Sequence, residues 1–432
     1  MTTLENYWLP FTSNRRFKKE PRLLVRAEGM YFWNAAGDRL LDGCSGLFCC
    51  ALGHGRPEIG DAVARQYAQL DYGPAFQYSH PGAFELANRL AAIAPGDLNH
   101  FFFVNSGSES VDTAMKIALL YHRSRGEGQR QRFVSRERGY HGVNFGGVSL
   151  AGLVKNRTDF GPGLPGVVHM RHTWLPENRF VAGQPERGAD RADDLQRLVD
   201  LYGGETIAAC FVEPIAGSTG ILVPPRGYLE RLREICDRYG ILLVFDEVIT
   251  GFGRTGRAFA ADTFGVLPDV LTMAKALTNG ALPMGAVAVR DEIYDRIVSA
   301  PAEGEIELFH GYTYSAHPLA CAAAIATQTI FRDEQIFERA AERAPYFLER
   351  VFALRDLPIV RDIRGFGLLA GIDLAPATRW GERGFAVLQR LFAAGLVVRM
   401  TGDTLILAPA LVAEREHIDR ICEIAREVLR AA

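Results

Sequence analysis

The stretch ILLVFDEV, residues 241–248, is a continuous apolar run that leads into two adjacent carboxylates, Asp246 and Glu247. Uninterrupted apolar runs of this length are typical of strands that are covered by helices on both faces. A carboxylate at the end of such a strand is costly to bury unless a positive group meets it. The stretch therefore predicts a buried strand of an α/β sheet, with a charged site at the carboxyl end of the strand.

The segments on both sides of this run alternate between strand-like and helix-like patterns from about residue 100 to residue 290. Such alternation predicts a mostly parallel sheet with helices on both sides, in which ligands bind beyond the carboxyl ends of the strands. The segments are HFFFVNSGSES (100–110), SVDTAMKIALLYHRSR (110–125), TIAACFVEP (206–214), PRGYLERLREICDRYG (225–240), DVLTMAK (269–275) and AVAVR (286–290). Four polar side chains fall at strand ends: Ser106, Glu213, Asp246 and Lys275.

The two ends of the chain have a different organisation. MYFWNAAGDRLLD (30–42) predicts a hairpin, and the part after about residue 300 begins with two long helical stretches, followed by short strands and a terminal helix. The length of 432 residues suits two or three domains. We therefore expect a large α/β domain over residues 60–305 and a smaller α+β domain over residues 306–432, to which residues 1–59 contribute strands.

The composition is that of an ordinary globular protein, with 48% hydrophobic residues, 23% charged residues and a formal net charge of −3. This balance gives no support for a nucleic-acid partner, which would favour a basic surface. No apolar run approaches the roughly 18 residues of a membrane span, and the first residues lack a signal-peptide layout. The seven cysteines favour a reducing cytoplasm over a disulfide framework. Cys44, Cys49 and Cys50 lie near His54, but their spacing does not predict a metal site.

Lys275 is unusual because the chain uses arginine for almost all of its positive charge. Of the 48 lysines and arginines, only five are lysines, at positions 18, 19, 116, 155 and 275. One interpretation is a chance lysine whose ammonium group reaches water. The other is a site that needs an amine able to lose its proton and form a Schiff base, which arginine cannot do.

Two glycine-containing segments suggest phosphate or nucleotide sites. In NSGSES (105–110) a strand turns into a helix, so Ser106, Gly107 and Ser108 could hold a phosphate on backbone N–H groups; an ordinary helix N-cap is the alternative. GFGRTG (251–256) matches the dinucleotide fingerprint, but the residues after it have weak helical periodicity and soon reach a proline. We reject the nicotinamide interpretation because that fingerprint requires the glycines to open a helix directly.

Three further residues complete a candidate site. Tyr140 and His141 lie beside glycines in ERGYHG (137–142), and Arg399 follows an apolar strand, where it needs a carboxylate from the protein or from a substrate. Together with the helix start, Asp246 and Lys275, these groups are the set that pyridoxal phosphate (PLP) requires. The lysine amine binds the aldehyde of PLP, and the helix start binds the phosphate of PLP. The carboxylate keeps the pyridine nitrogen of PLP protonated, so that the ring acts as an electron sink.

Nearly the whole chain resembles the class III, PLP-dependent aminotransferases of fold type I, and most of all the β-alanine (ω-amino acid):pyruvate transaminases. The stretches that carry the resemblance are WLPFTSNRRF, GHGRPEIGDAV, FQYSHP, NSGSES, GYHGVN, VEPIAGSTGILVPPRGYLERLREICD, ILLVFDEVITGFGRTG, AKALTNGALPMGAV and HGYTYSAHPLACAA. The resemblance implies PLP as the cofactor. It also implies a homodimer, or a homotetramer built as a dimer of dimers, with active sites shared between subunits.

The resemblance also implies a role for each matching residue. Lys275 is the expected Schiff-base lysine and proton carrier, and Asp246 is the expected partner of the pyridine nitrogen. The other cofactor contacts are Val248 under the ring, Tyr140 above it, His141 behind Asp246, Glu213 near the phenolic side, Ser106, Gly107 and Ser108 in the phosphate loop, and Thr313 from the neighbouring subunit. On the substrate side the expected residues are Tyr140, a mobile Arg399 for the carboxylate of pyruvate, and Phe48, where several relatives carry tryptophan.

The implied reaction is a ping-pong transamination. An ω-amino acid or primary amine gives up its amino group and leaves as an aldehyde or ketone, and pyruvate becomes L-alanine. The alternatives are another class III PLP enzyme, such as a 2-oxoglutarate-dependent aminotransferase or an aminomutase, and a non-catalytic or nicotinamide-binding α/β protein. Phe48 has a smaller ring than tryptophan and no N–H donor, so it bears on the choice of amine rather than on the reaction class.

Overall fold

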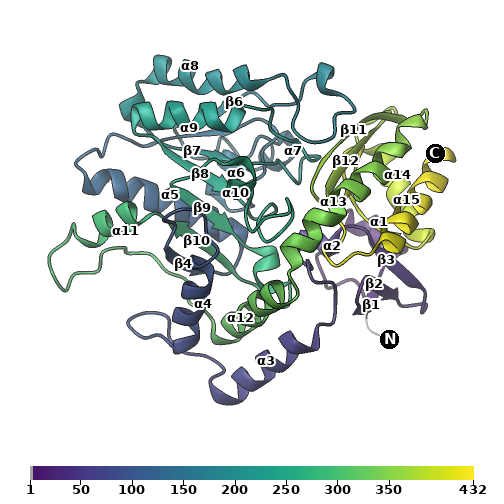
Figure 1. Cartoon of the computed structure of the whole chain (residues 1–432), viewed down its shortest axis with the longest axis horizontal. Helices are drawn as coiled ribbons and strands as arrows, with labels where there is room; N and C mark the ends of the chain where they lie inside the picture. The colour runs from purple at the N-terminus through teal and green to yellow at the C-terminus, as the bar shows by residue number, and fades with distance from the viewer. Residues whose placement is uncertain (1–2) are drawn as a thin grey trace.

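The computed structural model describes residues 3–432, and its centre is a seven-stranded sheet (Figure 1). The strand order is β4-β10-β9-β8-β7-β5-β6; β9, β8, β7, β5 and β6 are parallel, whereas β10 is antiparallel to β4 and β9. The strands are β4 (His100–Val104), β5 (Arg132–Arg136), β6 (Val167–Met170), β7 (Ile207–Val212), β8 (Leu242–Asp246), β9 (Val270–Met273) and β10 (Gly285–Val289). The mostly parallel α/β sheet predicted from the sequence is confirmed.

Strand β8 is apolar along its whole length because its two faces enter two different hydrophobic cores. Leu243 and Phe245 belong to the core that contains helix α9 (Tyr228–Tyr239), whereas Val244 packs in the core that contains helix α5 (Gly107–Ser124). The other helices from residue 57 to residue 333 are α3 (Pro57–Gln69), α4 (Pro81–Ala91), α6 (Phe145–Leu150), α7 (Val154–Arg157), α8 (Asp193–Tyr202), α10 (Ala260–Phe264), α11 (Asp291–Val298) and α12 (Pro318–Asp333). Burial on both faces thus explains the absence of polar alternation in ILLVF.

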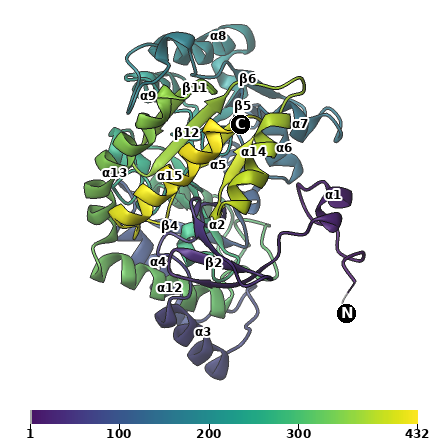
Figure 2. The same ribbon diagram turned by 90° about the vertical axis from the view of Figure 1, so that its right-hand side faces the viewer.

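The two ends of the chain fold together into two four-stranded sheets beside the large sheet (Figures 1 and 2). The predicted hairpin forms strands β2 and β3, and the C-terminal strand β13 pairs with β3 in parallel, Leu396 opposite Leu41. One sheet holds β1 (Leu24–Glu28), β2 (Tyr31–Asn34), β3 (Arg39–Asp42) and β13 (Leu396–Val397); the other holds β11 (Val360–Phe366), β12 (Leu369–Leu374), β14 (Arg399–Thr401) and β15 (Thr404–Leu407). The domain limits at residues 59 and 305 remain a prediction.

Helices accompany these smaller sheets. Figure 2 shows α13, α14 and α15 on the same side of the molecule as the two smaller sheets, with the short helix α1 at the periphery. The helices are α1 (Asn14–Lys19), α2 (Ser45–Phe48), α13 (Ile336–Phe352), α14 (Glu382–Ala393) and α15 (Arg415–Arg430). None of the helices in residues 3–432 combines the length and the apolar character needed to cross a membrane.

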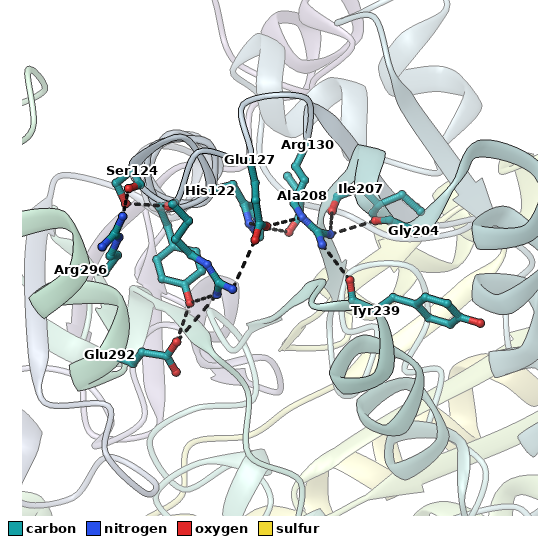
Figure 3. Close-up of polar contacts among 12 residues, drawn as sticks. His122, Ser124, Glu127, Arg130, Gly204, Ile207, Ala208, Tyr239, Glu292 and Arg296 are labelled. Atoms are coloured by element: carbon teal, nitrogen blue, oxygen red, sulfur yellow. Dashed lines mark hydrogen bonds and ion pairs between the residues drawn. The ribbon is translucent and has the colours of Figure 1, made fainter. Parts of the chain in front are cut away.

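A polar cluster closes the amino-terminal edge of the parallel strands, the edge away from the predicted site (Figure 3). The guanidinium of Arg130 donates to Glu127 and to the carbonyls of Gly204, Ile207 and Tyr239, at 2.7 to 3.1 Å. Nε2 of His122 donates to the carbonyl of Ala208 at 2.9 Å, and burial lowers the pKa of His122, which favours its neutral form. These contacts satisfy backbone carbonyls where helix α9 ends and strand β7 begins, so this edge is structural.

Candidate active site

A pocket with about 440 Å³ of empty space lies at the carboxyl ends of the parallel strands. Asp246 is the last residue of β8, Glu213 directly follows β7, and Lys275 follows β9. The pocket is lined by Gly107, Ser108, Tyr140, His141, Gly142, Glu213, Asp246, Val248, Ile249 and Lys275. All of these except Gly142 and Ile249 are residues that we predict from the sequence, and the two others are sequence neighbours of predicted residues.

Asp246 and His141 form a buried pair in the pocket wall. Nδ1 of His141 lies 2.8 Å from Oδ2 of Asp246, and facing a carboxylate it donates its proton. Oδ1 of Asp246 accepts from the backbone N–H of Val248 and from the hydroxyl of Thr272, each at 3.2 Å. Three donors therefore hold the carboxylate in one orientation. Nε2 of His141 is buried and has no hydrogen-bond partner within residues 3–432.

Glu213 fixes the segment that carries Tyr140. Its two carboxylate oxygens accept from the backbone N–H groups of Tyr140 and Gly217, both at 2.9 Å, and its side chain is buried. Burial raises the pKa of Glu213, with the nearby Asp246 adding to the rise, whereas His141 acts in the opposite direction. Burial likewise raises the pKa of Tyr140, while the charge of Arg399 lowers it.

Lys275 has an uncommon backbone and an unpaired amine. Its φ is +48°, in the left-handed region that side chains other than glycine rarely adopt. Such conformations persist where the surrounding structure imposes them, and they cluster at functional sites. Lys275 is half-buried, lines the pocket, and takes part in none of the ion pairs or side-chain hydrogen bonds found within residues 3–432. The amine is therefore available to a ligand in the pocket.

The start of helix α5 forms a close-fitting cradle of small residues. A Cβ on Gly107 would lie 3.0 Å from the methyl groups of Val248, and one on Gly142 would lie 2.5 Å from Oγ of Ser108. That hydroxyl accepts from the backbone N–H of Val143 at 3.1 Å. Ser106 does not line the pocket, because its hydroxyl accepts from the N–H of Glu109 at 3.2 Å and caps the helix. The N-cap alternative thus describes the Ser106 side chain, while Gly107 and Ser108 face the pocket.

Three further predicted residues lie outside the pocket wall. Phe48 is 3% exposed and belongs to the same buried hydrophobic cluster as Ile249, which does line the pocket. Arg399 begins strand β14, two residues after the apolar strand β13 ends, is half-buried, and takes part in no ion pair within residues 3–432. Thr313 is exposed, and its carbonyl accepts from the hydroxyl of Tyr72 at 3.1 Å. This chain's fold therefore does not bring Thr313 to its own pocket wall.

The pocket fits the chemical requirements of PLP. Lys275 offers an unpaired amine for the aldehyde, the start of α5 offers N–H groups and a positive dipole end for the phosphate, and Asp246 offers an oriented carboxylate for the ring nitrogen. Gly107 and Gly142 let Val248 and Ser108 pack closely at the start of α5, where a Cβ would clash with them. The arrangement can therefore bind a phosphorylated aldehyde and move a proton beside it.

Comparison with known sequences places the chain among aminotransferases. Residues 12–429 match the family model described as aminotransferase class III. The chain is 54% identical over 430 residues to the omega-aminotransferase of Caulobacter vibrioides, covering 99% of this chain and 97% of the relative. It is 47% identical over 431 residues to the omega-amino acid–pyruvate aminotransferase of Pseudomonas putida, covering 99% and 96% of the two chains.

Solved structures show the same fold. The omega-transaminase of Pseudomonas jessenii in complex with PMP superimposes with a TM-score of 0.93 at 33% identity, covering 98% of this chain and 96% of that chain. A thermostable (S)-enantioselective omega-transaminase from Thermomicrobium roseum has a TM-score of 0.90 at 36% identity, with coverages of 98% and 95%. These likenesses extend over nearly the whole chain rather than over the pocket alone.

Proposed function

This chain belongs to the class III aminotransferases, and on that basis we propose that it moves the amino group of an ω-amino acid or a primary amine to pyruvate. The products are an aldehyde or a ketone and L-alanine. The observation that carries the proposal is the unpaired amine of Lys275 in one pocket with the oriented carboxylate of Asp246. The printed name of the P. putida relative, an omega-amino acid–pyruvate aminotransferase, supports the choice of substrates.

Class III aminotransferases use PLP, which supplies an aldehyde that captures amines and a ring that withdraws electrons from the substrate carbon. We propose that Lys275 holds the cofactor and carries the proton that leaves and returns at this carbon. Asp246, held by His141 and Thr272, would meet the ring nitrogen. The backbone N–H groups of Gly107 and Ser108 would hold the phosphate, and Val248 and Tyr140, which line the pocket, would confine the ring.

An acceptor panel tests the proposal. With β-alanine as the donor, pyruvate should be converted to alanine faster than 2-oxoglutarate is converted to glutamate. The reverse preference would favour the 2-oxoglutarate-dependent alternative. Isomerisation of an amino acid without any acceptor would favour an aminomutase. The names of the C. vibrioides and P. putida relatives support neither alternative. A protein that carries no PLP when purified in its presence would contradict the assignment altogether.

We propose that Arg399 binds the carboxylate of pyruvate. An arginine that is half-buried and unpaired needs an anion, and no carboxylate within residues 3–432 forms an ion pair with it. Arg399 pairs with Ile406 across β14 and β15, and Ile406 belongs to the hydrophobic cluster of Ile249, which lines the pocket. Carboxylate-free amines would leave this arginine without a partner, so they gain nothing from it.

Replacing Arg399 by alanine should raise the KM for pyruvate by about 100-fold, because a charge-assisted bidentate contact is lost. The half-reaction with a carboxylate-free amine should change by less than about threefold, since that amine makes no such contact. Stopped-flow measurement of the two half-reactions separately gives both values, and Arg399→Lys should recover part of the pyruvate affinity. Equal losses in both half-reactions would show a structural arginine instead.

The region around Thr313 supports a proposal about assembly. Tyr72, Phe76 and Tyr314 are all exposed, and the rings of Tyr72 and Tyr314 lie 6.1 Å apart. Phe76 packs against Gly311, where a Cβ would lie 2.7 Å from its ring. An exposed aromatic patch of this kind marks an interaction surface. We propose that it joins two copies of the chain and that Thr313 reaches the cofactor phosphate of the other copy.

If each site is built from two chains, cofactor binding and dimerisation are linked by mass action. Thr313→Ala should then weaken PLP retention, and the loss should grow as the enzyme is diluted toward its dimer dissociation constant. Thr378→Ala, which alters an exposed threonine of the C-terminal part, serves as the matched control. A monomer that keeps all of its PLP and activity on dilution would contradict the shared site.

We further propose a cytoplasmic location. All seven cysteines are unpaired, and a reducing compartment keeps thiols in that state.

A further inference from the structure

Residues 44–49, which form the loop around helix α2, hold a backbone conformation that L-amino acids disfavour. Ser45 and Phe48 have φ values of +47° and +63°, and between them Gly46 has φ +64° and ψ −102°. Three left-handed residues in a stretch of four are not a local preference of the sequence. Such a backbone persists only where tertiary contacts impose it.

This loop stands beside the pocket. Phe48 belongs to the same buried hydrophobic cluster as Ile215 and Ile249, and Ile249 is part of the pocket wall. Burial raises the pKa of the Cys49 thiol, and the charge of Lys275 acts against that rise. A Cβ on Gly280 would lie 2.9 Å from Cβ of Cys49, so the loop packs against the segment that follows Lys275. A shift in the backbone of the loop would therefore move an aromatic ring that supports the pocket.

Asp42 holds the loop from one side. Its Oδ1 accepts from the backbone N–H of Cys44 at 2.9 Å, and its Oδ2 accepts from that of Gly46 at 2.7 Å. Nε2 of His54 lies 2.8 Å from the same Oδ2, and both side chains are largely buried. One carboxylate thus ties together two amides of the strained segment and an imidazole behind it.

Arg254 holds the loop from the other side. Its Nη2 donates to Oγ of Ser45 at 2.7 Å, and that hydroxyl donates to the carbonyl of Ala408 at 2.6 Å. Nη1 of Arg254 donates to the carbonyls of Ala408 and Pro409. The side chain is 1% exposed and has no carboxylate partner within residues 3–432, so its hydrogen bonds serve the loop and the end of β15.

The GFGRTG segment explains how Arg254 reaches this position. A Cβ on Gly253 would lie 2.7 Å from the ring of Phe337, and one on Gly256 would lie 3.0 Å from Cβ of Ala341, both on α13. The φ values of these glycines are +97° and +91°. The glycines therefore let the segment pack closely against α13 and place Arg254 between the loop and the C-terminal part.

We propose that Asp42 and Arg254 are positioning residues that hold residues 44–48 in their strained conformation and thereby set which amines the pocket accepts. The part of this inference that concerns substrates rests on the proposed function, the transfer of an amino group from an amine. We call the hydrogen bonds of Asp42 and of Arg254 to the loop the two clamps. With both clamps intact, Phe48 stays in its hydrophobic cluster and favours compact donors such as β-alanine. Release of either clamp lets the backbone relax, frees the ring, and favours bulky arylalkyl amines relative to compact ones.

Two substitutions test the clamps in different ways: one weakens the hydrogen bonds of Asp42, and the other disfavours the backbone conformation that the clamps hold. Asp42→Asn keeps the size of the side chain but replaces one accepting oxygen by a donor. Gly46→Ala has room for its methyl group, with the nearest heavy atom at 3.7 Å, so it acts only through the forbidden backbone angles. Asp362→Asn is the matched control: Asp362 is buried outside the pocket wall and accepts from Trp174, Phe180 and Arg364 at 3.0, 2.8 and 2.7 Å.

The selectivity is measured as kcat/KM for 1-phenylethylamine divided by kcat/KM for β-alanine. We expect both clamp variants to raise this ratio by about tenfold or more, mainly through KM, because small displacements of a supporting group change substrate fit strongly. The visible absorbance of bound PLP should remain, and Asp362→Asn should leave the ratio unchanged. Equal losses for both amines, or loss of PLP, would show general damage and would overturn the proposal.

Hydrogen exchange provides a readout that does not depend on activity. The amides of Cys44 and Gly46 should exchange slowly in the wild-type holoenzyme and much faster in Asp42→Asn. Unchanged exchange would overturn the clamp even if the selectivity shifted. If no amine is a donor, the proposed function fails, and the exchange data still decide whether the clamp exists. If Gly46→Ala does not fold, Ser45→Ala replaces it, because it removes only the hydroxyl that Arg254 binds.

Discussion

Replacement of Lys275 by arginine should abolish transamination, with kcat lowered by about 10⁴-fold. The substitution keeps the positive charge and nearly the length of the side chain, so the loss reports the chemistry of an amine. Arginine keeps its proton and forms no covalent link with an aldehyde, so it can neither hold the cofactor nor carry the substrate proton. The unpaired state of Lys275 in the pocket means that no ion pair is broken by the change.

The decisive measurement is borohydride reduction followed by mass spectrometry of the peptides. In the wild type, reduction should attach the cofactor to the peptide that contains Lys275, and in Lys275→Arg no peptide should carry it. Lys155→Arg, which alters an exposed lysine, is the matched control and should behave as the wild type. A Lys275→Arg enzyme that keeps its visible absorbance band and its turnover would remove this lysine from the reaction.

Asp246→Asn should slow proton abstraction by about 100- to 1,000-fold while PLP still binds. A negative charge at the ring nitrogen stabilises the electron density that the ring withdraws, and a neutral amide does not. The variant should fold, because the amide oxygen can still accept from the N–H of Val248 and the hydroxyl of Thr272. His141 can meet the new NH₂ group by adopting its other tautomer.

Single-turnover kinetics with a saturating amine measure this step without pyruvate. Thr272→Val separates charge from hydrogen bonding, because it removes one donor to Asp246 and keeps the carboxylate. That variant should lose less than about tenfold in the same rate, the equivalent of one ordinary hydrogen bond. A near-normal rate in Asp246→Asn, or an equal loss in both variants, would remove the charge of Asp246 from the mechanism.

Strands β4, β7, β8, β9 and β10 and most of the pocket were accessible from the sequence because they depend on local pattern, whereas β5 and β6 were not identified and the strand order was not predicted. The apolar run before Asp246 reflects a strand that is buried on both faces, and the carboxyl ends of parallel strands meet at one edge. Asp246, Glu213 and Lys275 therefore converge at this edge independently of the conformation of the loops. The rarity of lysine in the chain marked Lys275 before any geometry was known.

The substrate side was predictable only through the resemblance, and its details came from the fold. Nothing near Phe48 in the sequence indicates that it belongs to the same buried hydrophobic cluster as Ile249, about 200 residues further along the chain. The helix-cap geometry assigned the Ser106 hydroxyl to its own helix. Arg399 proved to begin a strand, and its lack of an ion pair is visible only in three dimensions.

The sequence by itself determined the α/β sheet, the position of the charged groups at its carboxyl edge and the chemistry those groups can support. Only the tertiary structure decided how the loop at residues 44–49 is held. Asp42 acts on neighbours a few residues away, but Arg254 meets Ser45 across 209 positions and Ala408 across 154. Hydrogen bonds between such distant segments leave no periodic trace in the sequence, because each depends on one distance and one direction that the folded chain sets.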